Sequence, residues 1–177
     1  MTVVIVPKFD FVRFLESIVL YRVTHLMWGK TSFVRSSGNA DACFRVVPPM
    51  AVLLAKHSAT KNYDISHVRF VAIGAAPVSA ELQEQVVKVI PNAEIGQAYG
   101  MTETCTVVSL FPLSQRIGTP GSAGVFIPGL RARIVKPDGT AAKAGEQGEL
   151  YVTGPSMALG YYNNEKACAE FHHVRAQ

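Results

Sequence analysis

A short segment near the middle of the chain, Gly-Gln-Ala-Tyr-Gly-Met-Thr-Glu-Thr at residues 96–104, gathers residue types that suit a bound nucleotide. Gly100 lets the backbone approach a ligand closely and adopt a positive φ. The Thr102 hydroxyl can donate to a phosphate oxygen, and the Glu103 carboxylate can hold Mg²⁺, a hard cation that prefers oxygen ligands. The Tyr99 ring can lie against a flat base. Residue types and spacing alone also fit an ordinary polar loop with a packed tyrosine and a solvated glutamate.

Strand and helix patterns on both sides indicate how this segment is held. A strand is predicted at 68–74 and a shorter one at 93–97, directly before the segment. Between them Ser79 can cap a helix. Its apolar face comprises Leu82, Val86, Val87 and Ile90. This is a strand–helix–strand unit with loops at the carboxyl ends of both strands, which is where ligands bind in open α/β sheets.

The preceding part of the chain predicts a second unit of the same kind. Residues 3–6 form a β-branched run that favours a buried strand, and Asp10 can cap the helix that follows. Phe11, Phe14, Leu15 and Ile18 recur with helical spacing. A strand at 21–26 completes the unit, and a helix at 50–56 begins after two prolines. Residues 27–45 show neither period and predict an irregular, exposed loop.

After Pro120 the chain becomes rich in glycine and turns. Strands are predicted at 130–135 and 149–153, joined through turns at 136–139 and 144–148. The predicted fold class is therefore α/β: a partial parallel sheet with flanking helices, followed by a small β-rich subdomain.

Composition excludes several classes of function. The net charge of +4, with no long Lys/Arg run, argues against nucleic-acid binding. Cys43, Cys105 and Cys168 lie far apart without a CxxC, so neither a disulfide framework nor a zinc site is predicted. No apolar stretch approaches the ~20 residues of a membrane helix. We expect an intracellular protein, cytoplasmic or peroxisomal, without a basis for choosing between the two.

The segment at 96–104 resembles the diagnostic motif of the adenylate-forming, or AMP-binding, superfamily, particularly its acyl-CoA synthetases and coumarate–CoA ligase-like members. Other stretches resemble the same family in the same order, and together they cover most of the chain: 3–26, 46–57, 74–79, 121–124 with 128–129, and 148–155 with 160–163. The resemblance implies the large N-terminal domain of such an enzyme, followed by a distorted-barrel subdomain.

The resemblance also implies a reaction and roles for particular residues. A carboxylic acid attacks the α-phosphate of ATP to give an acyl-adenylate, and coenzyme A then displaces AMP. Thr102 and Glu103 would be the catalytic residues, with Glu103 as the Mg²⁺ ligand. The nucleotide-binding set implied by the resemblance is Gly74, Ala75, Ala76, Pro77, Gln97, Ala98, Tyr99, Gly100, Met101 and Thr102.

Other family elements find no match in the chain: the phosphate loop, the ribose-binding aspartate and the C-terminal lysine. Gly29-Lys30-Thr31 is not a Walker loop, since position 24, where that loop needs glycine, is threonine. We therefore expect a fragment of an ATP-dependent acyl- or aryl-CoA ligase. The alternative is a catalytically inactive remnant that at most binds nucleotide or a partner protein. An unrelated dinucleotide-binding module is not indicated, because this sequence contains no G-x-G-x-x-G run.

These considerations predict an α/β part at 1–118, a β-rich part at 119–171 and a polar tail at 172–177. Residues 27–45 interrupt the family pattern, and either a gene-model artefact or a genuine insertion explains them. A parallel sheet without its neighbouring strands leaves edges unpaired, so association with another chain is also expected.

Overall fold

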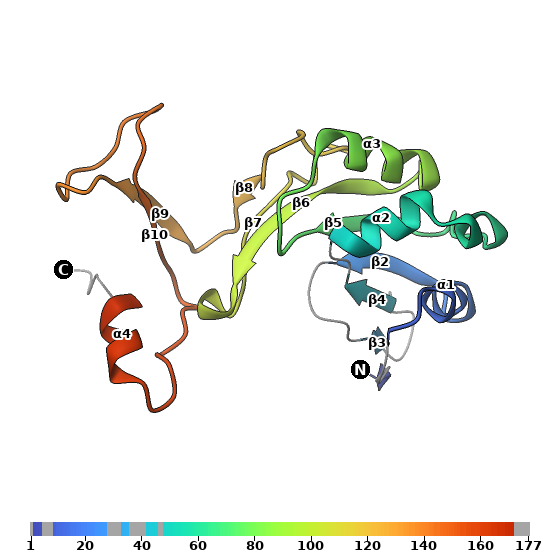
Figure 1. Ribbon diagram of the computed structural model, residues 1–177, viewed down its shortest axis with the longest axis horizontal. Coiled ribbons are helices and arrows are strands. Elements are labelled where there is room, and N and C mark those ends of the chain that lie inside the picture. Colours follow the sequence, from blue (N-terminus) through green and yellow to red (C-terminus); the bar gives the residue numbers. More distant parts are fainter. Residues whose placement is uncertain (1, 5–8, 28–32, 36–41, 46–47, 172–177) are drawn as a thin grey trace. The chain divides into compact units, whose positions relative to one another are not determined.

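The computed structural model describes residues 2–4, 9–27, 33–35, 42–45 and 48–171. The chain divides into two compact units (Figure 1). The first comprises residues up to Tyr99 together with Ser109–Val125, and the second comprises Gly100–Val108 and the residues from Phe126 onward. The division expected from sequence, at residues 118 and 119, stays a prediction.

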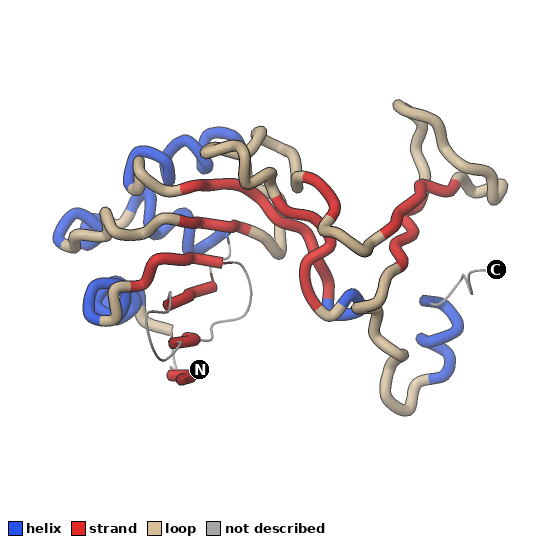
Figure 2. The backbone as a smooth tube through the Cα atoms, turned by 180° about the vertical axis from the view of Figure 1, so that it is seen from behind, coloured by secondary structure: helices blue, strands red, loops and turns tan. Residues whose placement is uncertain are grey.

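The main sheet is mixed, with a parallel centre. Its strand order is β1-β3-β4-β2-β5-β6-β7-β8. The bounds are β1 Thr2–Val4, β2 Val23–Met27, β3 Phe33–Arg35, β4 Ala42–Arg45, β5 Phe70–Ile73, β6 Glu94–Met101, β7 Thr106–Leu110 and β8 Val125–Phe126. β4, β2, β5 and β6 pair in parallel, whereas β1 and β3 add antiparallel pairings at one edge. Figure 2 draws the strands in red. The predicted α/β class with a partial parallel sheet is confirmed.

Helix α1, Phe11–Leu20, forms as its sequence predicts. Asp10 accepts a hydrogen bond from the Arg13 amide at 2.8 Å, which satisfies one of the amides left unpaired at a helix start. The buried residues are the predicted face, Phe11, Phe14, Leu15 and Ile18. Helix α2, Pro48–Lys56, begins at the first of its two prolines, where a missing amide costs least. A 3₁₀ turn, η1 at Ser58–Asn62, follows it.

Helix α3, Ala80–Val89, is also capped as predicted, by Ser79 accepting from the Leu82 amide at 3.2 Å. Val86 and Ile90 are fully buried, while Leu82 and Val87 are only partly buried against the core. Gln83 is buried as well, because its Nε2 donates to the Gly118 carbonyl at 2.5 Å. The sequence did not predict this polar contact.

The two faces of the central strands pack against different partners. Val71 and Ile73 of β5 join the large core formed with α1, α2 and α3, whereas Phe70 and Ala72 point to the opposite face. There Phe70 stacks on Phe111, with ring centroids 5.3 Å apart. The three helices therefore cover one face of the sheet, and the segment after β7 covers part of the other.

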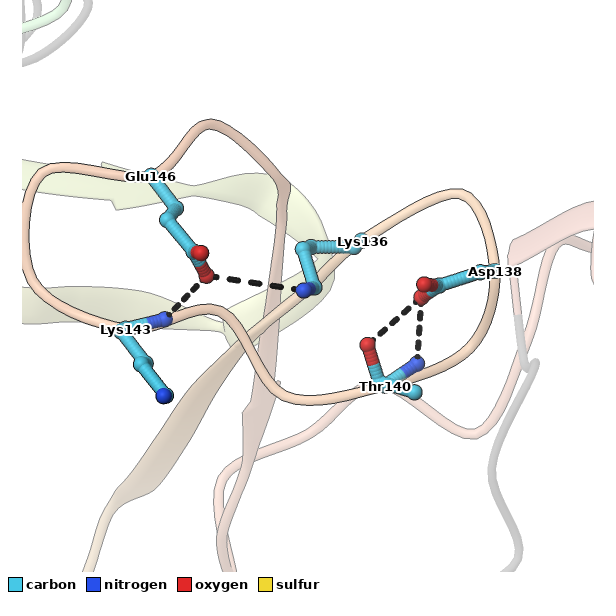
Figure 3. A network of polar contacts seen from close by, with 5 residues as sticks. All are labelled: Lys136, Asp138, Thr140, Lys143 and Glu146. Carbon is cyan, nitrogen blue, oxygen red and sulfur yellow. Dashed lines mark hydrogen bonds and ion pairs between the residues drawn. The ribbon is translucent and has the colours of Figure 1, made fainter.

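The second unit contains the predicted β-rich hairpin. β9, Arg131–Val135, pairs antiparallel with β10, Glu149–Thr153, which confirms both strands. The connection is held by the contacts in Figure 3: Asp138 accepts from the Thr140 amide and hydroxyl at 2.9 and 2.6 Å, and Glu146 accepts from the Lys143 amide at 2.8 Å. The hydroxyl and amide of Thr140 hold the pKa of the Asp138 carboxyl below its usual value.

One expectation from the sequence needs correction, and two strands and a helix were not predicted. The prediction of an irregular loop at 27–45 is wrong where β3 and β4 form. These two strands pair with each other, and they also pair with β1 and β2 respectively. Strands of this length are too short to show a period of two in the sequence. The remaining residues 28–32 and 36–41 lie outside the described part of the chain. Strands β7 and β8 and helix α4, Glu165–Phe171, were not predicted.

In the described part of the chain, no helix has the length and apolar character of a membrane span.

Gly96→Ala should destabilise the chain. A Cβ at this position would overlap the Cγ, Cδ1 and Cβ atoms of Phe111, which is only 1% exposed and has little room to move. Overpacking of this kind costs about 1–3 kcal/mol of unfolding free energy. Urea denaturation of the 177-residue chain measures the loss. In a Phe111→Gly background, which lacks all three of these atoms, the added methyl should cost far less, and an equal cost in both backgrounds would contradict the packing argument.

Candidate functional site

The segment at 96–104 belongs mainly to a strand. β6 continues through Ala98 to Met101, so the loop predicted for these positions is wrong. β7, which begins only five residues later, is the neighbouring strand in the sheet. The 3₁₀ turn η2, Thr102–Thr104, then ends the strand. The Met101 amide donates to Thr104 Oγ1 at 3.2 Å, and the Thr104 hydroxyl donates to the Met101 carbonyl at 2.9 Å. Cys105 follows with a φ of 55°, which reverses the chain into β7.

Parallel pairing brings the loop after β5 to the same sheet edge as this segment. Ile73 is opposite Gln97 in the register of β5 and β6, so the chain after Ile73 leaves the sheet beside Ala98. The loop is also tied to β6 directly, because the Val78 amide donates to Gln97 Oε1 at 3.1 Å. The structure therefore brings residues 74–78 next to Gln97, as expected of two carboxyl-terminal loops.

Within this loop the backbone is unusual at one residue. Ala75 has a φ of 71°, in the left-handed region that residues other than glycine seldom adopt. Gly74 is buried, whereas Ala75, Ala76 and Pro77 are exposed. A residue held in this sparsely populated region motivates a functional hypothesis for the loop.

β6 carries its predicted site residues in different environments. Gln97 and Ala98 are each 7% exposed, while the Tyr99 side chain is 37% exposed. Tyr99 is thus not enclosed in the core and is available to a ligand. Among the described residues, the buried Nε2 of Gln97 finds no hydrogen-bond partner. A buried donor of this kind is costly unless water or a ligand accepts from it.

Glu103 lies on η2 and is held by the segment that follows β10. Its carboxylate Oε1 accepts a hydrogen bond from the Tyr161 hydroxyl at 2.5 Å, and its backbone carbonyl accepts from the Ala158 amide at 2.7 Å. The hydrogen bond from Tyr161 holds the pKa of Glu103 below its usual value, and the Glu103 carboxylate raises the pKa of Tyr161. Glu103 is therefore ionised at neutral pH.

Tyr161 is the site residue that sequence reasoning missed. The surrounding run at 160–163 was noticed only as a family-like structural motif, and no local pattern connects a tyrosine to a carboxylate 58 positions earlier. Thr102, the second predicted catalytic residue, is exposed on the same turn as Glu103. Gly100, Met101, Thr102 and Glu103 all belong to the second unit.

The donor set at Glu103 fits a cation that arrives with a nucleotide. No group of three or more His, Cys, Asp or Glu side chains that would hold a metal occurs in the part of the chain that the structure describes. Mg²⁺ is commonly held by one or two carboxylates together with substrate phosphates, and it does not require a cage made only of protein atoms. A single ionised carboxylate beside an exposed threonine hydroxyl suits that arrangement.

Known proteins share both the sequence and the architecture. The family described as AMP-binding enzyme matches residues 1–162. The chain is 36% identical over 170 residues to probable 4-coumarate–CoA ligase 1 of Dictyostelium discoideum, covering 95% of the chain and 27% of that protein. It is 33% identical to 4-coumarate–CoA ligase 1 of Arabidopsis thaliana, covering 95% of the chain and 28% of that protein. The chain thus spans little more than a quarter of these relatives' length.

Solved structures agree with these relatives. The long-chain-fatty-acid–CoA ligase FadD1 from Archaeoglobus fulgidus superposes with a TM-score of 0.73 at 26% identity, covering 92% of this chain and 31% of its own. ATP-bound MatB from Rhodopseudomonas palustris gives a TM-score of 0.70, also at 26% identity, covering 94% of this chain and 29% of its own.

Tyr161→Phe should raise the pKa of the Glu103 carboxyl toward its usual value, because the hydrogen bond from Tyr161 favours the charged carboxylate. In the wild type this bond contributes stability that is present above the unfolded-state pKa and is lost as pH falls through the lower folded-state pKa. An NMR titration of the Glu103 side-chain carboxyl carbon measures this pKa in the wild type and in Tyr161→Phe. Coincident titration curves would show that the two side chains do not interact in solution.

Proposed function

The chain belongs to the AMP-binding enzyme family, and on that premise we propose that it forms part of the nucleotide site of an ATP-dependent acid–CoA ligase. In the proposed reaction a carboxylate oxygen of the substrate attacks the α-phosphorus of ATP and pyrophosphate leaves. The thiol of coenzyme A then attacks the carbonyl carbon of the acyl-adenylate, and AMP leaves as the thioester forms.

One observation carries this proposal: the parallel register of β5 and β6, together with the bond from Val78 to Gln97, places the loop after β5 beside the second half of β6. Ligands of open α/β sheets bind at the carboxyl ends of the strands. We assign Gly74, Ala75, Ala76 and Pro77 to the adenine and acyl pockets. These residues follow β5 directly and can line the pockets with backbone atoms and small side chains.

β6 and η2 supply the remaining groups of the proposed site. Gln97, Ala98, Gly100 and Met101 would contribute the wall of the nucleotide pocket, and the partly exposed Tyr99 ring would stack on the adenine. The exposed Thr102 hydroxyl would donate to a phosphate oxygen. In these roles the residues of β6 and η2 would position ATP and the acid, so that the substrate carboxylate lies close to the α-phosphate.

Glu103 would hold the Mg²⁺ that accompanies ATP. When bound, the cation neutralises charge that develops on the pyrophosphate leaving group. The part played by this chain is to keep the carboxylate ionised and in a fixed orientation, which the Tyr161 hydroxyl and the Ala158 amide support.

The acid is proposed to be aryl or medium-chain. Both relatives described above are designated 4-coumarate–CoA ligases or probable members of that class, and they share about a third of their matched residues with this chain. Coenzyme A is the proposed acceptor in the second step.

A second candidate function rests on apolar exposure in the second unit. Ile134 of β9 and Leu150 of β10 are 46% and 43% exposed, and Leu159 and Tyr162 are almost fully exposed. A two-stranded sheet is marginally stable by itself. These exposed apolar residues favour an alternative function. In it the chain is catalytically inactive, binds nucleotide weakly, and has its exposed apolar residues covered by a partner protein.

Tyr99→Ala should weaken ATP binding about 5- to 150-fold, since stacking of a base on an aromatic ring contributes about 1–3 kcal/mol. Equilibrium dialysis of ATP with Mg²⁺ against the 177-residue chain measures the dissociation constant. Tyr162→Ala, at a tyrosine that is 94% exposed, is the matched control and should bind ATP like the wild type. Equal affinity of the wild type and the Tyr99 variant would refute the assigned adenine contact.

Pyrophosphate release tests whether the 177-residue chain itself carries out the adenylation step. We expect no release by the 177-residue chain above that of Glu103→Ala, with ATP, Mg²⁺ and a panel of cinnamic and fatty acids, because no phosphate loop was recognised in its sequence. Removing even one group that stabilises a transition state costs about 10²–10³ in rate. Release clearly above the Glu103→Ala control would show that this chain carries out the adenylation step and would exclude the inactive alternative.

A further inference from the structure

The contact between Tyr161 and Glu103 connects two segments of the second unit that are distant in sequence. The Tyr161 hydroxyl donates to Glu103 Oε1 at 2.5 Å, at the short end of the range for a hydroxyl bound to a carboxylate. The Ala158 amide donates to the Glu103 carbonyl at 2.7 Å. The same short segment therefore holds both the backbone and the side chain of Glu103.

Tyr161 is itself fixed by the start of helix α4. Its backbone amide donates to Cys168 Sγ at 3.0 Å, and its carbonyl accepts from the Asn164 amide at 3.3 Å. Asn164 in turn accepts from the Ala167 amide at 3.1 Å, which caps the first turn of the helix. The phenol is thus presented from a hydrogen-bonded turn, and Tyr161 is 38% exposed.

This arrangement specifies which carboxylate oxygen remains for a ligand. The bond from Tyr161 engages Oε1, so the other carboxylate oxygen, Oε2, is the one assigned to the cation. A long glutamate side chain loses rotamer freedom when it coordinates a metal, and a side chain that is already held loses less. A hydrogen bond to one oxygen therefore favours binding of a cation by the other.

We propose that Tyr161 is a positioning residue for the metal ligand Glu103: its hydroxyl orients the carboxylate so that Oε2 faces the cation carried by the nucleotide. This inference rests on the proposed function, because it needs the nucleotide-bound cation assigned there to Glu103. It adds a residue from the segment before α4 to the role assigned to Glu103, and both residues belong to the second unit.

The test compares Tyr161→Phe with Tyr162→Phe, two variants that each lose one hydroxyl from adjacent tyrosines. Mn²⁺ replaces Mg²⁺ as a cation with similar oxygen ligands, and its electron paramagnetic resonance signal reports binding directly. At pH 8, where Glu103 is ionised in every variant, Tyr161→Phe should raise the dissociation constant of Mn²⁺·ATP about three- to tenfold. Binding of ATP without a cation should be unchanged, and Tyr162→Phe should match the wild type.

The outcomes separate this inference from the proposed function. If the wild type binds Mn²⁺·ATP more tightly than Glu103→Ala but Tyr161→Phe equals the wild type, the positioning role is wrong and the metal site stands. If the wild type and Glu103→Ala bind Mn²⁺·ATP equally, or not at all, both proposals fail. If Tyr161→Phe weakens cation-free ATP to the same extent, Tyr161 supports the fold generally and the inference is overturned.

Discussion

The parallel pairing of β5 with β6 is the constraint on which the candidate site depends. Residues 70–73 lie opposite residues 94–97, and this register decides which positions stand together where the two strands end. A shift by one residue would exchange the faces of every side chain on β6. Gln97 would then lose its buried position and its bond to the Val78 amide. The connection at 74–78 would have no fixed place relative to Tyr99.

Packing on the far side of the sheet holds that register. Phe111 is 1% exposed and stacks on Phe70, and its ring fills space over Gly96 and Gly118 that a side chain at either glycine would occupy. The amide of Phe111 donates to the Gln97 carbonyl at 3.0 Å, so the residue that packs on β6 is also hydrogen-bonded to it. Phe111 therefore holds β6, the strand that carries the candidate site, both by packing on it and by a hydrogen bond.

Local signals predicted much of this fold, and non-local contacts account for what they missed. The caps at Asp10 and Ser79 each bond an amide three residues later, so the sequence alone suffices to place them. The helical spacing of the α1 face is equally local. In contrast, Gln83 is buried because of a carbonyl 35 positions away, and β3 and β4 are strands only because of their pairing partners. Sequence reasoning located the residues at 96–104 but described a loop where pairing makes a strand.

Tyr161 shows the same limit within the site and explains what the second unit contributes. A motif read along the chain identifies a carboxylate suited to a cation, yet it cannot identify the group that orients this carboxylate. Within the described ranges no group of three or more His, Cys, Asp or Glu side chains could hold a metal, so we expect Glu103 to bind a free cation weakly. A cation held by one carboxylate and by nucleotide phosphates binds only when ATP binds. In the proposed site the orientation of Glu103 would then influence nucleotide binding, and the Tyr161 hydroxyl would act on ATP without contacting it.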